Sequence, residues 1–387
     1  MQTDFSKLDL SRVPSLSFVV DEVAVRKNLE ILHYVQKQSG AKILAALKAF
    51  SMWSLGPLTS QYLSGTCSSG INELRLGYEE YGGESHVFSA AYTEKDLTDI
   101  LKFADTVVFN SFSQWQRFRL QVERARKEHP QLKFGLRINP EHSEGDVEIY
   151  DPCAPKSRLG IPFSQFKPDE LSGISGLHFH TLCEQDLPPL QRTLAAVEEK
   201  FGEYLHKMAW VNFGGGHHIT REGYQVEELI KTIKDFSKKY DVQVYLEPGE
   251  AIAIGCGVLV AEVLDLTWNG MNQAILNTSA TCHMPDTLEM PYRAEIMNAA
   301  VADELANTYR LGGMTCLAGD VIGDYSFAEP LKVGQRLIFE DMAHYTMVKT
   351  STFNGTKLPS IVLWNSENDS VKVIKEFGYE DFKQRLS

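Results

Sequence analysis

Four segments of the sequence place chemically useful residues directly after short apolar runs. Lys48 ends ILAALK, His180 ends GLHFH, glycines 214–216 follow WVNF, and Glu247 follows VQVYL. An amine, an aromatic ring, backbone N–H groups without side chains and a carboxylate are groups that can bind a phosphorylated aromatic cofactor. Because ligands bind at the carboxyl ends of the strands in a parallel barrel, we expect the four segments to meet at one rim.

Lys48 is the candidate for covalent chemistry. It follows five small or apolar residues, 43–47, which would partly desolvate its amine. Desolvation disfavours the ammonium form, and a neutral amine can form a Schiff base. The alternative is a strand-end lysine whose charged head reaches solvent.

The glycine run and Glu247 could complete such a site. Gly214, Gly215 and Gly216 could let backbone N–H groups approach a phosphate, although a tight strand-to-helix turn is the alternative. The run is not a GxGxxG after a first strand, so a dinucleotide site is not supported. Glu247, before a Pro-Gly turn, could pair with a protonated ring nitrogen or could cap the turn.

The histidines leave a second class of function open. His178 and His180 lie on one predicted strand, and we expect one in the core and one in the site. Because HxH pairs occur at strand ends as metal ligands, a metal-dependent barrel hydrolase using these two with His217 and His218 is an alternative. No nearby set of acidic ligands is obvious, so we expect no metal.

Two residues near the C-terminus are also candidates. Cys316 and Asp320 lie in the glycine-rich segment GGMTCLAGD, where a thiol and a carboxylate could act as an acid/base element. A small buried thiol is the alternative for Cys316. Tyr345, in AHYTM, could either pack or donate a hydrogen bond to a phosphate.

Alternating strand-like and helix-like segments predict the scaffold that positions these residues. The predicted strands are nine short apolar runs: Ser17–Val20, Ile43–Leu47, Thr66–Ser68, His86–Phe88, Thr106–Phe109, Phe134–Ile138, Gly176–Phe179, Trp210–Phe213 and Val242–Leu246. The helices between them carry apolar stripes, and Ser113 with Gln116 predicts a capping box. This α/β pattern favours a (β/α)8 TIM-like barrel over residues 15–255, with a doubly wound open sheet as the alternative.

The pattern changes after Gly255. Segments such as GVLVAEVLDLTW and SIVLWN are rich in β-branched residues, with few helices between them. We therefore expect a mainly β C-terminal domain, a barrel or a sandwich, over residues 256–387. We also expect residues 1–14 to join this domain.

The composition limits the class of protein and its partners. A chain of 387 residues fits two domains, and its net charge of −13 disfavours a nucleic-acid partner. The sequence contains no apolar run of about 18 residues or more and no secretory signal, so no membrane partner is expected. The six cysteines are scattered without a CxxC pair, which favours a reducing, cytoplasmic location.

Several motifs, in order along nearly the whole chain, resemble a known family. They are AALKA at 45–49, GLHFH at 176–180, FGGG at 213–216, EPG at 247–249, TCLAGD at 315–320 and HYT at 344–346. The sequence is similar to the fold-type III decarboxylases that depend on pyridoxal 5′-phosphate (PLP), the group of ornithine and diaminopimelate decarboxylases. Within that family, LHFHTLCE, WVNFGGGHHIT, YLEPGEA, HMPDTLEMPY and TCLAGDVIGDY most resemble members acting on carboxynorspermidine or carboxyspermidine.

The resemblance implies a role for each candidate. Lys48 would carry PLP, His180 would stack on its ring, and Glu247 would keep the ring nitrogen protonated. Cys316 would reprotonate the α-carbon, and Asp320 would help to bind the substrate amine. The phosphate would be bound by the glycine loop and the Tyr345 hydroxyl: Gly214, Gly215, Gly216 and Tyr345. Sites in this family form between two subunits, so a homodimer is implied.

Two positions depart from the wider family. Glu250 stands where relatives commonly have the arginine of EPGR, and 181–183 read Thr-Leu-Cys in place of a Gly-Ser pair. The added carboxylate of Glu250 suits a cationic polyamine precursor as substrate. The segment HMPDTLEMPY offers three further polar residues that could bind the same substrate: His283, Asp286 and Glu289. Decarboxylation of diaminopimelate, arginine or ornithine on the same fold is the alternative.

Overall fold

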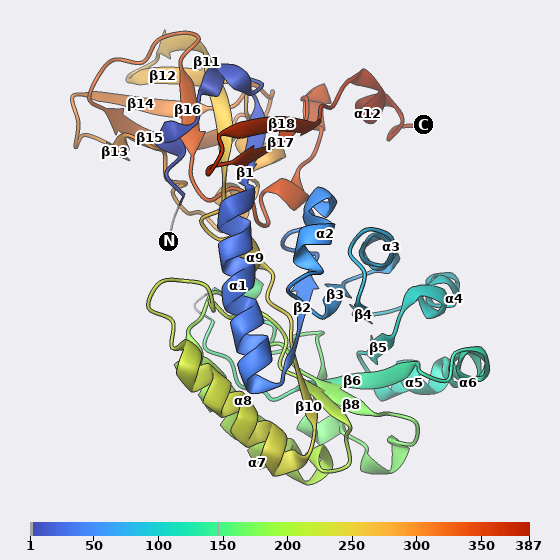
Figure 1. Cartoon of the computed structure of the whole chain (residues 1–387). Helices are drawn as coiled ribbons and strands as arrows, with labels where there is room; N and C mark the ends of the chain where they lie inside the picture. The colour runs from blue at the N-terminus through green and yellow to red at the C-terminus, as the bar shows by residue number, and fades with distance from the viewer. Residues whose placement is uncertain (1–2, 146) are drawn as a thin grey trace. The chain divides into compact units, whose positions relative to one another are not determined.

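The computed structural model describes residues 3–145 and 147–387. The chain divides into two compact units, which we call the barrel unit (26–252) and the sheet unit (residues up to 25 together with 253–387). Figure 1 shows the fold from the N-terminus in blue to the C-terminus in red. Within the described residues, no helix combines the length and the apolar character needed to cross a membrane.

The barrel unit is a closed ring of parallel strands, which confirms the predicted (β/α)8 TIM-like fold. The strands pair in the order β2-β3-β4-β5-β6-β8-β9-β10, and β10 pairs with β2 to close the ring. Their bounds are β2 (Lys42–Ala46), β3 (Gly65–Ser68), β4 (Glu84–Phe88), β5 (Thr106–Phe109), β6 (Lys133–Asn139), β8 (Gly176–His178), β9 (Trp210–Asn212) and β10 (Gln243–Leu246). The short β7 (Ile161–Pro162) pairs with β6.

Amphipathic helices connect these strands. They are α1 (Glu22–Ser39), α2 (Gly56–Thr59), α3 (Ile71–Glu80), α4 (Glu94–Phe103), α5 (Phe112–Arg117), α6 (Arg119–Glu128), α7 (Leu187–Leu205), α8 (Val226–Tyr240) and α9 (Glu250–Ala253). In α8 the apolar residues at spacings of three and four are buried, as the pattern predicts. The predicted cap at Ser113 is wrong, because α5 begins earlier and Ser111 accepts the Gln114 N–H at 3.2 Å.

The first strand does not belong to the barrel. β1 (Ser17–Asp21) pairs antiparallel with β11 (Gly257–Trp268) and parallel with β17 (Ser360–Asn365). The expected membership of residues 15–25 in the barrel domain is therefore wrong. All five residues of β1 are buried, so the strand has the continuous apolar character of a barrel strand, and only its distant pairing partners reveal its true sheet.

The sheet unit is mainly β, as expected. Its strands pair in the order β13-β15-β14-β12-β11-β1-β17-β18, and β16 pairs with β11. The remaining bounds are β12 (Asn272–Leu276), β13 (Ala299–Val301), β14 (Asn307–Gly312), β15 (Val321–Phe327), β16 (Arg336–Phe339) and β18 (Ser370–Lys375), with short helices α10 (Ala280–His283), α11 (Asp286–Glu289) and α12 (Tyr379–Lys383). Alternation along β1 places Phe18 in one hydrophobic cluster and Val19 in another.

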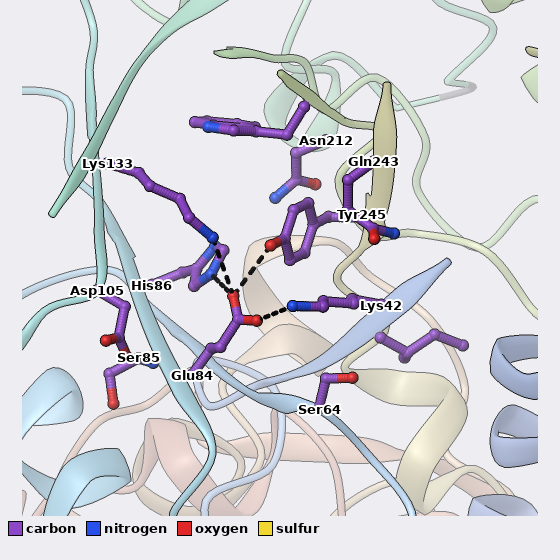
Figure 2. A network of polar contacts seen from close by, with 12 residues as sticks. Lys42, Ser64, Glu84, Ser85, His86, Asp105, Lys133, Asn212, Gln243 and Tyr245 are labelled. Atoms are coloured by element: carbon purple, nitrogen blue, oxygen red, sulfur yellow. Dashed lines mark hydrogen bonds and ion pairs between the residues drawn. The ribbon is translucent and has the colours of Figure 1, made fainter. Parts of the chain in front are cut away.

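A charged network lies where the barrel strands begin (Figure 2). Glu84, at the start of β4, accepts a hydrogen bond from the Tyr245 hydroxyl at 3.0 Å and lies 3.0 Å from His86 Nε2. It also pairs with Lys42 and, at 3.9 Å, with Lys133. Burial alone would raise the pKa of Glu84, but His86 and the two lysines hold it well below its usual range. Glu84 is therefore ionised at neutral pH.

We expect Glu84→Gln to lower the thermal unfolding midpoint at pH 7 by roughly 4–8 °C, because it leaves partly buried cations unpaired at a cost of about 2 kcal/mol. Since the folded-state pKa is lowered, the carboxylate stabilises the protein above its ordinary pKa of 4.5 and loses this effect as pH falls below it. The difference in unfolding midpoint between wild type and variant should therefore shrink in thermal scans below pH 4.5.

Glu123→Gln, which removes an exposed ion pair with Arg119, is the control. Equal midpoints for Glu84→Gln and wild type at pH 7 would contradict the argument.

Candidate active site

A pocket opens among the carboxyl ends of the barrel strands. Its lining residues are Ala46, Lys48, Cys67, Ser68, Ser69, Phe88, Arg137, His178, His180, Gly215 and Glu247. The structure thus brings together four residues predicted from the sequence: Lys48, His180, Gly215 and Glu247. Gly214 and Gly216 flank Gly215 in the loop that follows β9.

Lys48 follows β2 in a segment that its neighbours hold in place. The Ala46 N–H donates to Pro248 O at 3.0 Å, and the Leu47 N–H donates to Cys67 O at 3.1 Å. The Lys48 side chain is accessible through the open pocket, yet the barrel atoms around it desolvate the amine and lower its pKa from 10.5. Cys67 and Glu247 oppose this effect, and Arg137 adds to it. A larger neutral fraction makes this amine a better nucleophile.

Glu247 is held ionised by its neighbours. His178 Nε2 lies 3.2 Å from one carboxylate oxygen, and Asn212 Nδ2 donates to the other at 2.7 Å. Burial alone would raise the pKa of Glu247, but His178 and the hydrogen bond from Asn212 lower it to about 2. A negative charge is therefore fixed at the bottom of the predicted ring-binding site at neutral pH.

Both histidines of β8 and its extension line the pocket, so the expectation that one of them faces away is wrong. Residues two apart on an extended segment lie on the same face, so alternation places His178 and His180 together rather than on opposite sides. His180 Nδ1 accepts the Gly215 N–H at 3.1 Å. Desolvation, with Lys48 and Arg137 nearby, holds the pKa of His180 well below 6.5, so its ring is neutral and suited to stacking.

The glycine loop leaves no room for side chains. A Cβ at Gly215 would lie 2.2 Å from Glu247 O, and one at Gly216 would lie 2.0 Å from Leu182 O. Gly214 and Gly216 also have positive φ values of 72° and 84°. The Gly214 N–H donates to Asn212 Oδ1 at 2.8 Å and the Gly215 N–H to His180, so phosphate binding by these two groups would require an exchange of partners.

Sequence reasoning missed Arg137, Phe88 and Asn212. The guanidinium of Arg137 lies over the Phe88 ring at 4.5 Å and donates to His180 O at 3.2 Å. The Phe88 ring lies 5.5 Å from that of His178. Burial lowers the pKa of Arg137 to about 10, so it remains a cation beside the pocket at neutral pH. The sequence does offer a signal for two of these residues, because Arg137 and Asn212 are polar residues inside otherwise apolar strands.

The other predicted site residues lie in the sheet unit, except Glu250. Cys316 is exposed, and its backbone N–H donates to Asn354 Oδ1 at 2.7 Å. Asp320 is buried and accepts four hydrogen bonds, from Ser279 Oγ, the Thr281 N–H, and the N–H and hydroxyl of Thr315. This arrangement fits a carboxylate that fixes the Cys316 loop better than one that binds a substrate amine.

The residues proposed for a cationic substrate have partners of their own. Lys349 pairs with Asp286 and, at 3.4 Å, with Glu289. His283 is fully buried, with Nδ1 3.1 Å from Thr278 Oγ1, and burial lowers its pKa to about 4. Tyr345 is half-buried, at a positive φ of 47°.

Glu250 begins α9 and lies outside the pocket lining. Its carboxylate Oε2 is 3.4 Å from His218 Nε2, and its contact with the substrate stays a prediction.

Comparison with known proteins decides the family. The family model described as the C-terminal sheet domain of pyridoxal-dependent decarboxylases matches residues 17–343. The chain belongs to the pyridoxal-dependent decarboxylases. The decarboxylase activity and the PLP cofactor expected from the sequence are thereby confirmed.

Relatives of this decarboxylase are similar over nearly their whole length. A carboxynorspermidine/carboxyspermidine decarboxylase of Campylobacter jejuni is 42% identical, over 97% of this chain and 99% of that protein. A carboxyaminopropylagmatine decarboxylase of Synechocystis is also 42% identical, over 97% of this chain and 96% of that protein. The solved structure of the Campylobacter jejuni carboxynorspermidine decarboxylase with norspermidine has a TM-score of 0.88 at 41% identity, covering 96% of this chain and 100% of that one.

The pocket of the decarboxylase fits PLP. It holds a lysine amine of lowered pKa, an ionised carboxylate suited to a protonated ring nitrogen, and a neutral imidazole suited to stacking. These relatives do not favour a metal-dependent hydrolase, and His178 and His180 have the contacts described above within the decarboxylase pocket.

Proposed function

We propose that the decarboxylase acts on carboxynorspermidine or carboxyspermidine and releases norspermidine or spermidine in polyamine biosynthesis. The observation that carries this proposal is the 42% identity with an enzyme named for both substrates, over 99% of its length. The solved relative that is 41% identical contains norspermidine. The net charge of −13 agrees with a cationic substrate.

In this proposal each pocket residue has one task. PLP, when bound, withdraws electrons from the α-carbon of the substrate and so makes the loss of carbon dioxide possible. Lys48 attaches the cofactor covalently, and His180 stacks on its ring. Glu247 holds a proton on the ring nitrogen, while the loop at 214–216 and Tyr345 bind the phosphate.

We further propose that the enzyme is a homodimer whose two active sites are shared. Cys316 is exposed, so its thiol is available to the barrel of another subunit. The partner's Cys316 then returns a proton to the α-carbon after carbon dioxide has left. Asp320, with its carboxylate already bound by Ser279, Thr281 and Thr315, positions that loop.

Release of carbon dioxide from a panel of acids tests the substrate. We expect kcat/KM for carboxynorspermidine and carboxyspermidine to exceed that for diaminopimelate, arginine and ornithine by about 100-fold or more, because buried polar groups left unpaired by a wrong substrate are costly. Product analysis should identify norspermidine or spermidine.

The Synechocystis relative supplies the sharpest comparison, since it is 42% identical and is named for carboxyaminopropylagmatine. Faster turnover of carboxyaminopropylagmatine than of both proposed substrates would replace this assignment with that relative's substrate. Preference for diaminopimelate would overturn it altogether.

A further inference from the structure

Three potential metal ligands meet in the barrel unit, outside the pocket that Lys48 lines. They are Glu184, His218 and Glu250, and one ligand atom from each lies within 4.8 Å of those of the other two. They follow β8, β9 and β10, which are neighbouring strands of the barrel. Three ligand atoms at these distances from one another can bind the same cation.

His218 gives independent evidence that a ligand belongs here. The residue is 6% exposed, and neither of its buried ring nitrogens has a hydrogen-bond partner within residues 3–145 and 147–387. Its Nε2 lies 3.4 Å from Glu250 Oε2. A buried imidazole without hydrogen bonds costs free energy that a metal bound at a ring nitrogen would recover.

Backbone contacts fix the segments that carry the three residues. The Gln185 N–H donates to Gly216 O at 3.0 Å, and the His218 N–H donates to Gln185 O at 3.0 Å. The hydroxyl of Thr220 donates to Ala251 O at 2.6 Å. The loop after β8, the glycine loop and the start of α9 are therefore tied together, which is the rigidity that a metal site needs.

We propose that Glu184, His218 and Glu250 bind one divalent transition-metal ion. Two carboxylates and one imidazole form a mixed oxygen and nitrogen set, which suits Mn²⁺ or Zn²⁺ better than Mg²⁺ or Ca²⁺, since those ions prefer oxygen ligands alone. Glu184 is exposed, so water can complete the coordination. The bound ion joins three loops at the rim of the barrel.

Titration of the holoenzyme with Mn²⁺ tests the site. After dialysis against a chelator, free Mn²⁺ is followed by its electron paramagnetic resonance signal. We expect wild type to bind one Mn²⁺ per chain and Glu184→Gln to bind it at least about tenfold more weakly. Zn²⁺ should displace the bound Mn²⁺, because it binds such ligand sets more tightly.

Two further variants make the result decisive. Glu222→Gln removes an exposed carboxylate that lies outside the cluster, in the segment after β9 that also carries His218. This variant should bind Mn²⁺ as wild type does. His218→Gln should lose the ion while keeping the visible absorbance of bound cofactor, which reports an intact barrel. Absence of saturable uptake by wild type, or equal affinity in Glu184→Gln and wild type, would overturn the proposal.

Discussion

Lys48→Ala should lower kcat/KM by about 10⁴-fold or more and abolish the visible absorbance of bound cofactor. The reason is that the side chain supplies both the covalent link and the amine that must take the cofactor back after each turnover. Desolvation lowers the pKa of Lys48 and so favours the reactive neutral amine, which no other side chain lining the pocket can supply. Absorbance spectra of the purified variant and release of carbon dioxide measure the two effects.

Lys48→Arg is the matched control, because it keeps a cation at the same place but cannot form the bond. It should be as inactive as Lys48→Ala. Lys37→Ala, at the exposed end of α1, should retain full activity and absorbance. A yellow, active Lys48→Ala protein would remove the basis of the proposed site.

The same variant tests the shared active site. If each site combines the barrel of one subunit with the partner's Cys316, mixing Lys48→Ala with Cys316→Ala should restore activity that neither has alone. Random exchange makes half of the dimers mixed, and each mixed dimer has one intact site, so about a quarter of wild-type activity should return. No recovery in a mixture that forms dimers would contradict the sharing of sites.

The sequence was most informative where a residue's task follows from its place on a strand. Lys48 and Glu247 directly follow apolar strands, and parallel strands bring such residues to one rim whatever their distance in sequence. The glycine loop was predictable for the same reason, but its tight approach to Glu247 O and Leu182 O was not, because these contacts depend on how neighbouring loops pack.

The structural predictions failed where contacts between distant parts of the chain determine how a segment pairs or packs. β1 resembles a barrel strand in every local respect, but its partners lie some 240 and 340 residues further on, which periodicity cannot reveal. The family resemblance implies that Asp320 helps to bind the substrate amine, and this role stays a prediction, but the hydrogen bonds that its carboxylate accepts were not foreseen. Its burial depends on Ser279 and Thr281, and no local pattern predicts that contact.

Glu247→Gln should lower kcat by about 10²–10⁴-fold while leaving the cofactor attached. Lys48 is intact in this variant, so its visible absorbance should persist. An amide cannot carry the negative charge that holds a proton on the ring nitrogen, and without that proton the ring accepts electrons from the α-carbon poorly. The variant therefore separates retention of the cofactor from its reactivity.

The pH dependence sharpens this prediction. His178 and Asn212 lower the pKa of Glu247 to about 2, so the wild-type carboxylate stays ionised throughout the range from pH 5 to pH 9 and contributes no inflection there. The defect of Glu247→Gln should accordingly be of similar size at every pH in that range. Asn212→Ala, which removes one hydrogen bond but leaves the charge, should lose far less kcat. If Glu247→Gln retained wild-type kcat, the carboxylate would only hold His178 and Asn212 in place, and the proton on the ring nitrogen would need another source.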